Sequence, residues 1–259
     1  MRTILVLVLI AIPLLLKAQV EVPELITDRP DQTESSAVVP HKSLQIETGF
    51  MMENDKDEMI KQKSFVYNTT LLRYGLLENF EIRLGLEYLG EKVDIKNTDT
   101  TSTFTGLSPV YTGFKVKITD EEGCRPEIAF LGGLVLPFTA NDDFKPEYSA
   151  ANVRFAFSHT LSEHFSLGYN LGAEWDGETA IPGYFYSVAI GIDFTDKLKM
   201  FVESFGLIPE EGHTEHLFDS GLTYLLLPNF QLDISVGIGL NNNSTDNFLS
   251  LGITYRLPN

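Results

Sequence analysis

Hydrophobic and polar residues alternate without a break from Phe230 to Leu240. The apolar positions are Phe230, Leu232, Ile234, Val236, Ile238 and Leu240. A period of two predicts a β-strand with one hydrophobic and one polar face. At about 3.3 Å per residue and a tilt of roughly 40°, this strand would rise about 27 Å, close to the apolar band of an outer-membrane barrel. The polar face holds Gly, Ser, Gln and one Asp, which are groups suited to a confined interior.

The same alternation recurs along most of the chain and predicts about twelve strands. The predicted strands span residues 44–53, 64–74, 80–89, 104–118, 127–138, 152–161, 165–175, 184–194, 198–205, 217–226, 230–240 and 248–257. Within 64–74 and 198–205 the pattern does not fix which residues face which way. Pro109 and Pro137 remove backbone donors inside two of the segments, which predicts bulges or shortened strands there.

Short and long connections between the predicted strands alternate. Tight polar turns, such as residues 77–79 and 227–229, alternate with longer polar links, such as 54–62 and 91–103. Outer-membrane barrels have short periplasmic turns, longer extracellular loops and an even number of strands. We therefore predict an all-β fold, a closed antiparallel up-and-down transmembrane β-barrel over residues 43–259. The alternative is a secreted soluble β-sandwich or small barrel, because alternation alone does not say which face meets water.

The residues that precede the predicted barrel divide into two parts. Residues 1–18 combine Arg2, an apolar run and a small Ala18, which is the plan of a secretory signal peptide. Residues 19–42 are rich in proline and polar residues, so we expect an N-terminal periplasmic segment or a plug in the barrel lumen. No later stretch is apolar over about 18 residues, so we expect no membrane-spanning helix. Together these features predict export to the outer membrane of a Gram-negative cell.

The net charge and the cysteine content limit the kinds of partner and site that this chain can have. The formal charge is -17, and a chain without Arg2 and Lys17 would carry about -19, which argues against nucleic acid as a partner. Cys124 is the only cysteine, so neither a disulfide framework nor a cysteine metal cluster is expected. We expect the partners to be outer-membrane lipid, the outer-membrane assembly machinery and an unidentified small-molecule solute.

Four segments of the chain, taken together, resemble the sequences of a known protein family. They are Thr27-Asp-Arg-Pro-Asp-Gln-Thr-Glu-Ser-Ser36, Leu44-Gln-Ile-Glu-Thr-Gly-Phe50, Leu222-Thr-Tyr-Leu-Leu226 and Gln231-Leu-Asp-Ile-Ser-Val-Gly-Ile-Gly-Leu240. In these segments the sequence resembles the outer-membrane transporter family named for the MetA pathway of phenol degradation, in its Bacteroidetes form. The likeness extends over nearly all of the mature chain. It implies an outer-membrane β-barrel that transports a solute, with no agreed substrate and no catalytic residues to carry over.

Charged residues on the polar faces of the strands would line the lumen if the apolar faces touch lipid. This predicted lumen-facing network comprises Glu47, Arg73, Glu81, Arg83, Glu87, Lys115, Lys117, Glu127, Arg154, Glu174, Asp193, Lys199, Glu203, Asp233 and Arg256. Opposite charges on neighbouring strands should meet across the wall. They would then either brace and fill a narrow barrel or line a polar path for a solute, and the two readings are compatible.

Two other clusters invite chemistry, although no cofactor is implied. His213 and His216 lie among carboxylates in a loop and are candidate metal ligands, against a reading as a solvated acidic loop. A lipid hydrolase would need a hydroxyl, an imidazole and a carboxylate together in space, for which the sequence candidates are Ser158, His159, Ser162, Glu163 and His164. Closeness in sequence does not create such geometry, so we expect no enzyme.

The sequence therefore predicts a passive transporter or channel for a small solute, hydrophobic or aromatic if the family name is a guide. The alternative is a plugged barrel with a structural or surface-interaction role. Channel conductance separates the two. If residues 19–42 fill the lumen, their removal should raise conductance.

Overall fold

The computed structural model describes residues 23–56, 59–96, 98, 100–210 and 212–257. Thirteen strands are found in these ranges: β1 (Leu44–Lys56), β2 (Ile60–Leu77), β3 (Phe80–Ile95), β4 (Thr101–Leu107), β5 (Val110–Thr119), β6 (Glu127–Leu136), β7 (Ala150–Thr160), β8 (Phe165–Glu174), β9 (Gly183–Asp193), β10 (Leu198–Pro209), β11 (Glu215–Leu227), β12 (Phe230–Gly239) and β13 (Asn247–Leu257). The predicted signal peptide, residues 1–18, lies outside the described residues. None of the helices in the described ranges is long and apolar enough to span a membrane.

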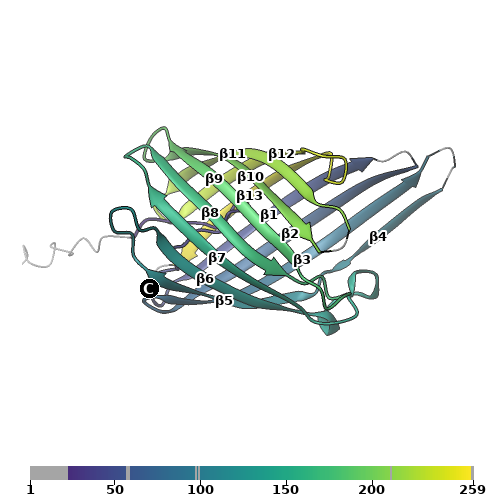
Figure 1. The fold of residues 1–259 in the computed structure, drawn as a ribbon, viewed down its shortest axis with the longest axis horizontal. Helices are drawn as coiled ribbons and strands as arrows, with labels where there is room; N and C mark the ends of the chain where they lie inside the picture. Colours follow the sequence, from purple (N-terminus) through teal and green to yellow (C-terminus); the bar gives the residue numbers. More distant parts are fainter. Residues whose placement is uncertain (1–22, 57–58, 97, 99, 211, 258–259) are drawn as a thin grey trace, which may run out of the picture.

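The strands form one sheet that closes on itself (Figure 1). All pairings between the strands are antiparallel. Except for β4 and β5, which both pair with β3, each strand pairs with its neighbours in sequence, and β1 pairs with β13 to complete the ring. Leu44 lies opposite Leu257, so the barrel begins and ends at the same end of the wall. The predicted transmembrane β-barrel is confirmed, and a single closed sheet excludes a sandwich of two sheets.

The barrel wall has twelve strands because β4 continues the line of β5. Strand β3 pairs through Phe80–Gly85 with β5 and through Tyr88–Asp94 with β4. The predicted single strand 104–118 is therefore wrong, since Ser108 and Pro109 interrupt it, and Pro109 has no N–H for the ladder. The predicted strand 127–138 is also too long.

Strand β6 ends at Leu136 because Pro137 opens a turn. This 3₁₀ turn, η1 (Pro137–Thr139), is followed by a second, η2 (Asp142–Phe144).

Strands β1 to β4 extend into segments that were predicted to be loops. Residues 54–62 and 91–103 were predicted as loops, yet β1 runs to Lys56, β2 starts at Ile60, β3 runs to Ile95 and β4 starts at Thr101. Polar residues can continue a hydrogen-bonded ladder in water, which a hydropathy pattern does not register. These strand ends form an extracellular extension of the wall (Figure 1).

The outer surface of the barrel is apolar. Ile234 is 42% exposed and Leu84 is 38% exposed, and residues of β12 alternate between buried and exposed along the strand. A soluble protein would bury such an apolar belt, whereas a bilayer covers it. The ambiguous face of residues 64–74 is also settled, because Arg73 is buried inside and Asn68 is exposed, with a bulge between Val66 and Asn68.

Candidate functional site

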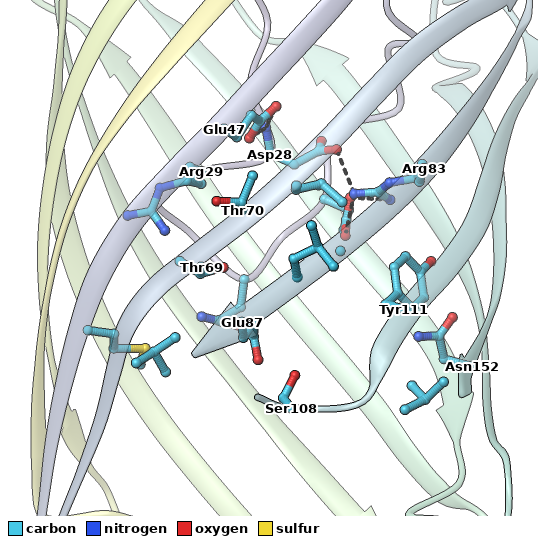
Figure 2. Close-up of a pocket in the computed structure, with 18 of the residues that line it drawn as sticks. Asp28, Arg29, Glu47, Thr69, Thr70, Arg83, Glu87, Ser108, Tyr111 and Asn152 are labelled. Carbon is cyan, nitrogen blue, oxygen red and sulfur yellow. Dashed lines mark hydrogen bonds and ion pairs between the residues drawn. The ribbon is translucent and has the colours of Figure 1, made fainter. Parts of the chain in front are cut away.

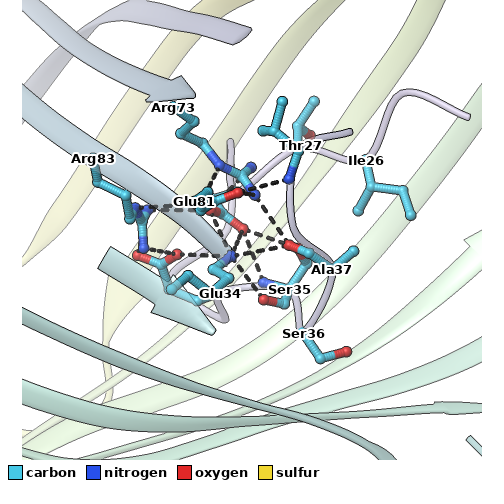
Figure 3. A network of polar contacts seen from close by, with 12 residues as sticks. Ile26, Thr27, Glu34, Ser35, Ser36, Ala37, Arg73, Glu81 and Arg83 are labelled. Carbon is cyan, nitrogen blue, oxygen red and sulfur yellow. Dashed lines mark hydrogen bonds and ion pairs between the residues drawn. The ribbon is translucent and has the colours of Figure 1, made fainter. Parts of the chain in front are cut away.

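The barrel interior holds residues 23–41, which we call the N-terminal segment (Figure 3). Pro23, Pro30 and Pro40 prevent a regular element, so the backbone groups of the segment need other partners. Side chains of the strands supply them: Asp28 N–H donates to Glu47 at 3.1 Å, Gln32 N–H to Glu203 at 2.8 Å, Glu34 N–H to Asn170 at 2.8 Å and Val39 N–H to Glu81 at 2.7 Å. Strands on all sides of the barrel thus hold one irregular chain.

Arg73 of β2 is the centre of a buried charge cluster. Its guanidinium lies 3.0 Å from Asp28, 2.8 Å from Glu47 and 2.9 Å from Glu81. A fourth contact is a hydrogen bond of 3.1 Å to the carbonyl oxygen of Ala37. All of these charged side chains are buried, so each depends on the others for compensation.

Asp28 joins the N-terminal segment to three strands at once. In addition to Arg73, its carboxylate contacts Arg83 of β3 at 3.1 Å and Lys115 of β5 at 2.9 Å. Glu34 reinforces the same pair of cations, at 2.8 Å from Arg83 and 3.6 Å from Lys115. Burial alone would raise the pKa of Asp28, but the three positive charges outweigh burial and hold that pKa well below its usual value.

Replacing Asp28 with asparagine should therefore change how stability depends on pH. A carboxyl group with a lowered pKa stabilises the fold above its unfolded pKa of about 3.9, and this stabilisation is lost as the pH falls toward the folded pKa. We expect the difference in unfolding free energy between wild type and Asp28→Asn to be constant from about pH 7 to 5 and to shrink below about pH 4. Urea unfolding at each pH measures it. Asp196→Asn, in an exposed turn, is the control, and a difference that grows on acidification would contradict the assignment.

Arg29 fixes the opposite side of the segment to the last two strands. Its guanidinium contacts Asp233 of β12 at 3.0 Å and Ser250 of β13 at 2.9 Å. The guanidinium lies directly on Gly49 and Gly252, which face each other across β1 and β13. A Cβ atom at Gly252 would come within 2.4 Å of Arg29, so only glycine permits this approach.

A third contact region lies on β9, β10 and β11. The Thr33 hydroxyl contacts Ser187 at 2.7 Å and also donates to the Glu203 carboxylate. Glu203 faces Asp219 in the register of β10 and β11, and both are 1% exposed. Neither carboxylate oxygen of Asp219 has a hydrogen-bond partner among the described residues.

Two cavities lie on opposite sides of the N-terminal segment. A cavity of about 600 Å³ opens toward the extracellular end and is shown in Figure 2. A cavity of about 530 Å³ lies toward the periplasmic end. Arg29 and Asp31 of the segment line both, so the segment is the partition between them.

The charged residues predicted for the lumen fall into two groups. Eight are buried: Glu47, Arg73, Glu81, Arg83, Lys115, Glu203, Asp233 and Arg256. The other seven are half-buried: Glu87, Lys117, Glu127, Arg154, Glu174, Asp193 and Lys199. Most of the buried group contacts the N-terminal segment directly, and Arg256 binds the carbonyl oxygens of Pro23 and Glu24.

Several half-buried residues pair with one another or with the segment. Lys117 lies 3.6 Å from Glu127, Arg154 lies 3.6 Å from Glu174, and Lys199 contacts both Asp193 and Glu24. The partial exposure of these side chains makes the pairs weaker than the buried Arg73 cluster, even where the distance is short, as for Lys199 and Glu24 at 2.7 Å.

Sequence reasoning missed the members that the N-terminal segment contributes. Asp28, Arg29 and Glu34 complete the network, and their signal was the density of charge in a stretch without periodicity. Asp219 was also missed, although it shares the polar phase of its strand with Gly221 and Thr223.

The two chemical candidates take other roles. Ser158 and His159 are adjacent in β7, so their side chains leave opposite faces and cannot form a catalytic pair. The Nδ1 of His216 pairs with the Tyr186 hydroxyl at 2.8 Å. In the described part of the chain, no three His, Cys, Asp or Glu side chains are arranged to hold a metal ion. His213 therefore belongs to no such group.

Comparison with known proteins gives one family and a set of similar folds. Residues 27–257 match the family described as "Putative MetA-pathway of phenol degradation". An outer-membrane channel from Pseudomonas putida F1 has a TM-score of 0.68 at 12% identity, covering 90% of this chain and 100% of that chain. The transport unit of the autotransporter AIDA-I from Escherichia coli has a TM-score of 0.53 at 10% identity, covering 89% and 92%. No curated protein matches the chain.

Proposed function

This chain belongs to the MetA-pathway of phenol degradation family, and from that membership we propose that it is a passive outer-membrane channel for a small apolar or aromatic solute. Its twelve-stranded barrel is similar in fold to an outer-membrane channel. We place it in the outer membrane, exported by the N-terminal signal and inserted by the assembly machinery, with no catalytic activity and no cofactor.

The observation that carries the proposal is the lining of the extracellular cavity. Met51, Val66, Leu131 and Val135 give it an apolar part, and the Tyr111 ring lies beside them. Polar groups at the same cavity, including Glu87 and Asn152, can bind a hydroxyl (Figure 2). The apolar part of the lining lies beside many charged and polar side chains, so a small amphipathic molecule such as a phenol would contact both.

We assign two roles to the interior charges. The buried cluster around Arg73 braces the wall and holds the N-terminal segment as a plug between the cavities. The half-buried group, which includes Glu87 and Arg154, lines the path that a solute follows past the plug. Transport is passive in this proposal, since it relies only on the two cavities and the movement of the plug.

Planar-bilayer recording tests the proposal. Purified mature protein should give discrete current steps, and millimolar phenol added on the extracellular side should reduce the current, whereas arabinose should not. Val135→Trp fills the extracellular cavity and should abolish the phenol effect. Val188→Trp, on the exposed outer face of β9, is the matched control.

The results separate this function from the second candidate, a plugged barrel with a structural role. The ion pairs that join the segment to β2, β3, β5 and β12 favour that candidate. Absence of current steps in folded protein would support it and overturn a channel. Current steps that phenol leaves unchanged, in wild type and in both variants, would overturn the aromatic solute.

A further inference from the structure

Four lysines occupy one face of the extracellular extension. Lys56 of β1 lies opposite Lys61 of β2, and Lys63 of β2 lies opposite Lys92 of β3. Residues that are directly opposite share a face of the sheet, and residues two apart on one strand do as well. All four side chains therefore project from the same side of the extension.

That side is the outside of the barrel. Lys56 is in phase with Met52, which pairs with the lipid-side Leu249 of β13, and Lys63 is in phase with Phe65. The inward phase of the same strands is occupied by Met51 and Val66, which line the extracellular cavity. The lysines thus face away from the lumen and toward the medium that surrounds the barrel.

Within the described residues, the four lysines of this face outnumber its carboxylates, of which Asp94 lies opposite Lys61. Among the described residues, Lys56, Lys61 and Lys63 form no ion pair, and Lys92 lies 3.7 Å from Asp94, the one carboxylate on this face. The chain as a whole has a formal charge of -17. A local excess of positive charge in so acidic a chain indicates an anionic partner.

An aromatic cluster lies directly below the lysines on the same face. Phe65 and Tyr67 are stacked at 5.5 Å, and Tyr67 lies 6.5 Å from Phe50 and 6.1 Å from Tyr88. Exposed aromatic residues form girdles at the level of the lipid headgroups in outer-membrane barrels. Lys63 follows Phe65 by two residues, or about 7 Å along the strand. The lysines therefore lie at the height of the headgroups and just above it.

We propose that this lysine face binds the phosphate groups of outer-leaflet lipid, that is, of the lipid A portion of lipopolysaccharide. The ammonium groups bind the phosphates, the aromatic cluster contacts the sugar and the upper acyl chains, and the apolar wall below contacts the remaining chains. Continuity of these three layers favours a lipid over free phosphate, which would use only the first. The inference rests on the outer-membrane location but not on channel function.

Binding of a defined lipid tests the inference. Wild-type protein in neutral detergent is titrated with fluorescent lipid A carrying phosphates and with the same lipid after dephosphorylation. The variant replaces Lys56, Lys61, Lys63 and Lys92 with glutamine, and the control replaces the exposed Lys145 and Lys197. Heat-dependent migration in gels verifies that each barrel is folded, and conductance in neutral lipid should be equal in all three.

Wild type and control should bind the phosphorylated lipid more tightly than the dephosphorylated one, and added salt should reduce the difference. The four-lysine variant should lose at least about tenfold in affinity, since each lysine near an anionic surface contributes about fivefold. Equal binding by the variant, or no preference for phosphate in wild type, would overturn the inference. Displacement of the lipid by millimolar inorganic phosphate would assign the site to free phosphate instead.

Discussion

Replacing Arg73 with methionine is expected to lower the free energy of unfolding of the barrel by about 3–5 kcal/mol. The change leaves Asp28, Glu47 and Glu81 buried without the cation that lies within 3.0 Å of each. Methionine retains much of the apolar stem of arginine, so the loss reports mainly the charge. Urea unfolding of protein refolded in lipid vesicles, followed by the fluorescence of Trp175, gives the value.

Two further variants identify the cause of the loss. Arg125→Met removes an exposed arginine that pairs with Glu122 in a turn, and it should change the unfolding free energy by less than about 1 kcal/mol. Adding Glu81→Gln to Arg73→Met removes one of the carboxylates left without a cation and should restore part of the stability. An Arg73→Met barrel as stable as wild type would mean that the cluster is not a coupled network.

Deleting residues 23–40 from the mature chain is expected to raise single-channel conductance several-fold. The N-terminal segment separates cavities of about 600 and 530 Å³, and its removal would join them into one aqueous path. Planar-bilayer recordings of wild type and deletion, at equal salt and voltage, measure the change. An unchanged conductance in folded protein would show that the segment does not obstruct the path.

A milder variant covers the case in which the deletion does not fold, because removal of Asp28 leaves several buried cations without a carboxylate partner. Arg29→Gln keeps the segment but breaks its 3.0 Å contact with Asp233. We expect frequent transitions to a higher conductance level, because one side of the segment is no longer fixed. Arg125→Gln, on an exposed turn, should behave as wild type.

The wall of the barrel could be predicted from sequence because period two assigns neighbouring residues to opposite faces. Glu81 and Arg83 could be placed on one face from alternation alone, and both are buried in the interior. The sequence also predicted that Pro109 and Pro137 would shorten or bulge the strands that contain them. Alternation could not give the length of the polar strand ends, because polar residues such as Lys61 of β2 and Thr103 of β4 continue the ladders, each paired with a residue of β3.

The interior arrangement could not be predicted, for a different physical reason. The N-terminal segment has no periodicity, and its contacts depend on distant residues that the closed barrel brings together. Arg29 and Asp233 are 204 positions apart. Nothing local to Gly49 or Gly252 signals that a guanidinium lies on them. The inward orientation of Asp219 could have been predicted, because hydrophobic and polar residues alternate regularly around it.

The interruption at Ser108 and Pro109 separates a part of the molecule that can be altered independently of the rest. Among the described strands, β4 pairs with β3 alone and takes no part in closing the ring. The adjoining ends of β3, at Ile95, and of β4, at Thr101, lie at the extracellular tip, and residues inserted between them are expected to disturb few native contacts. Foreign peptides spliced in at this point should be carried to the cell surface in accessible form, which makes the chain a scaffold for epitope display.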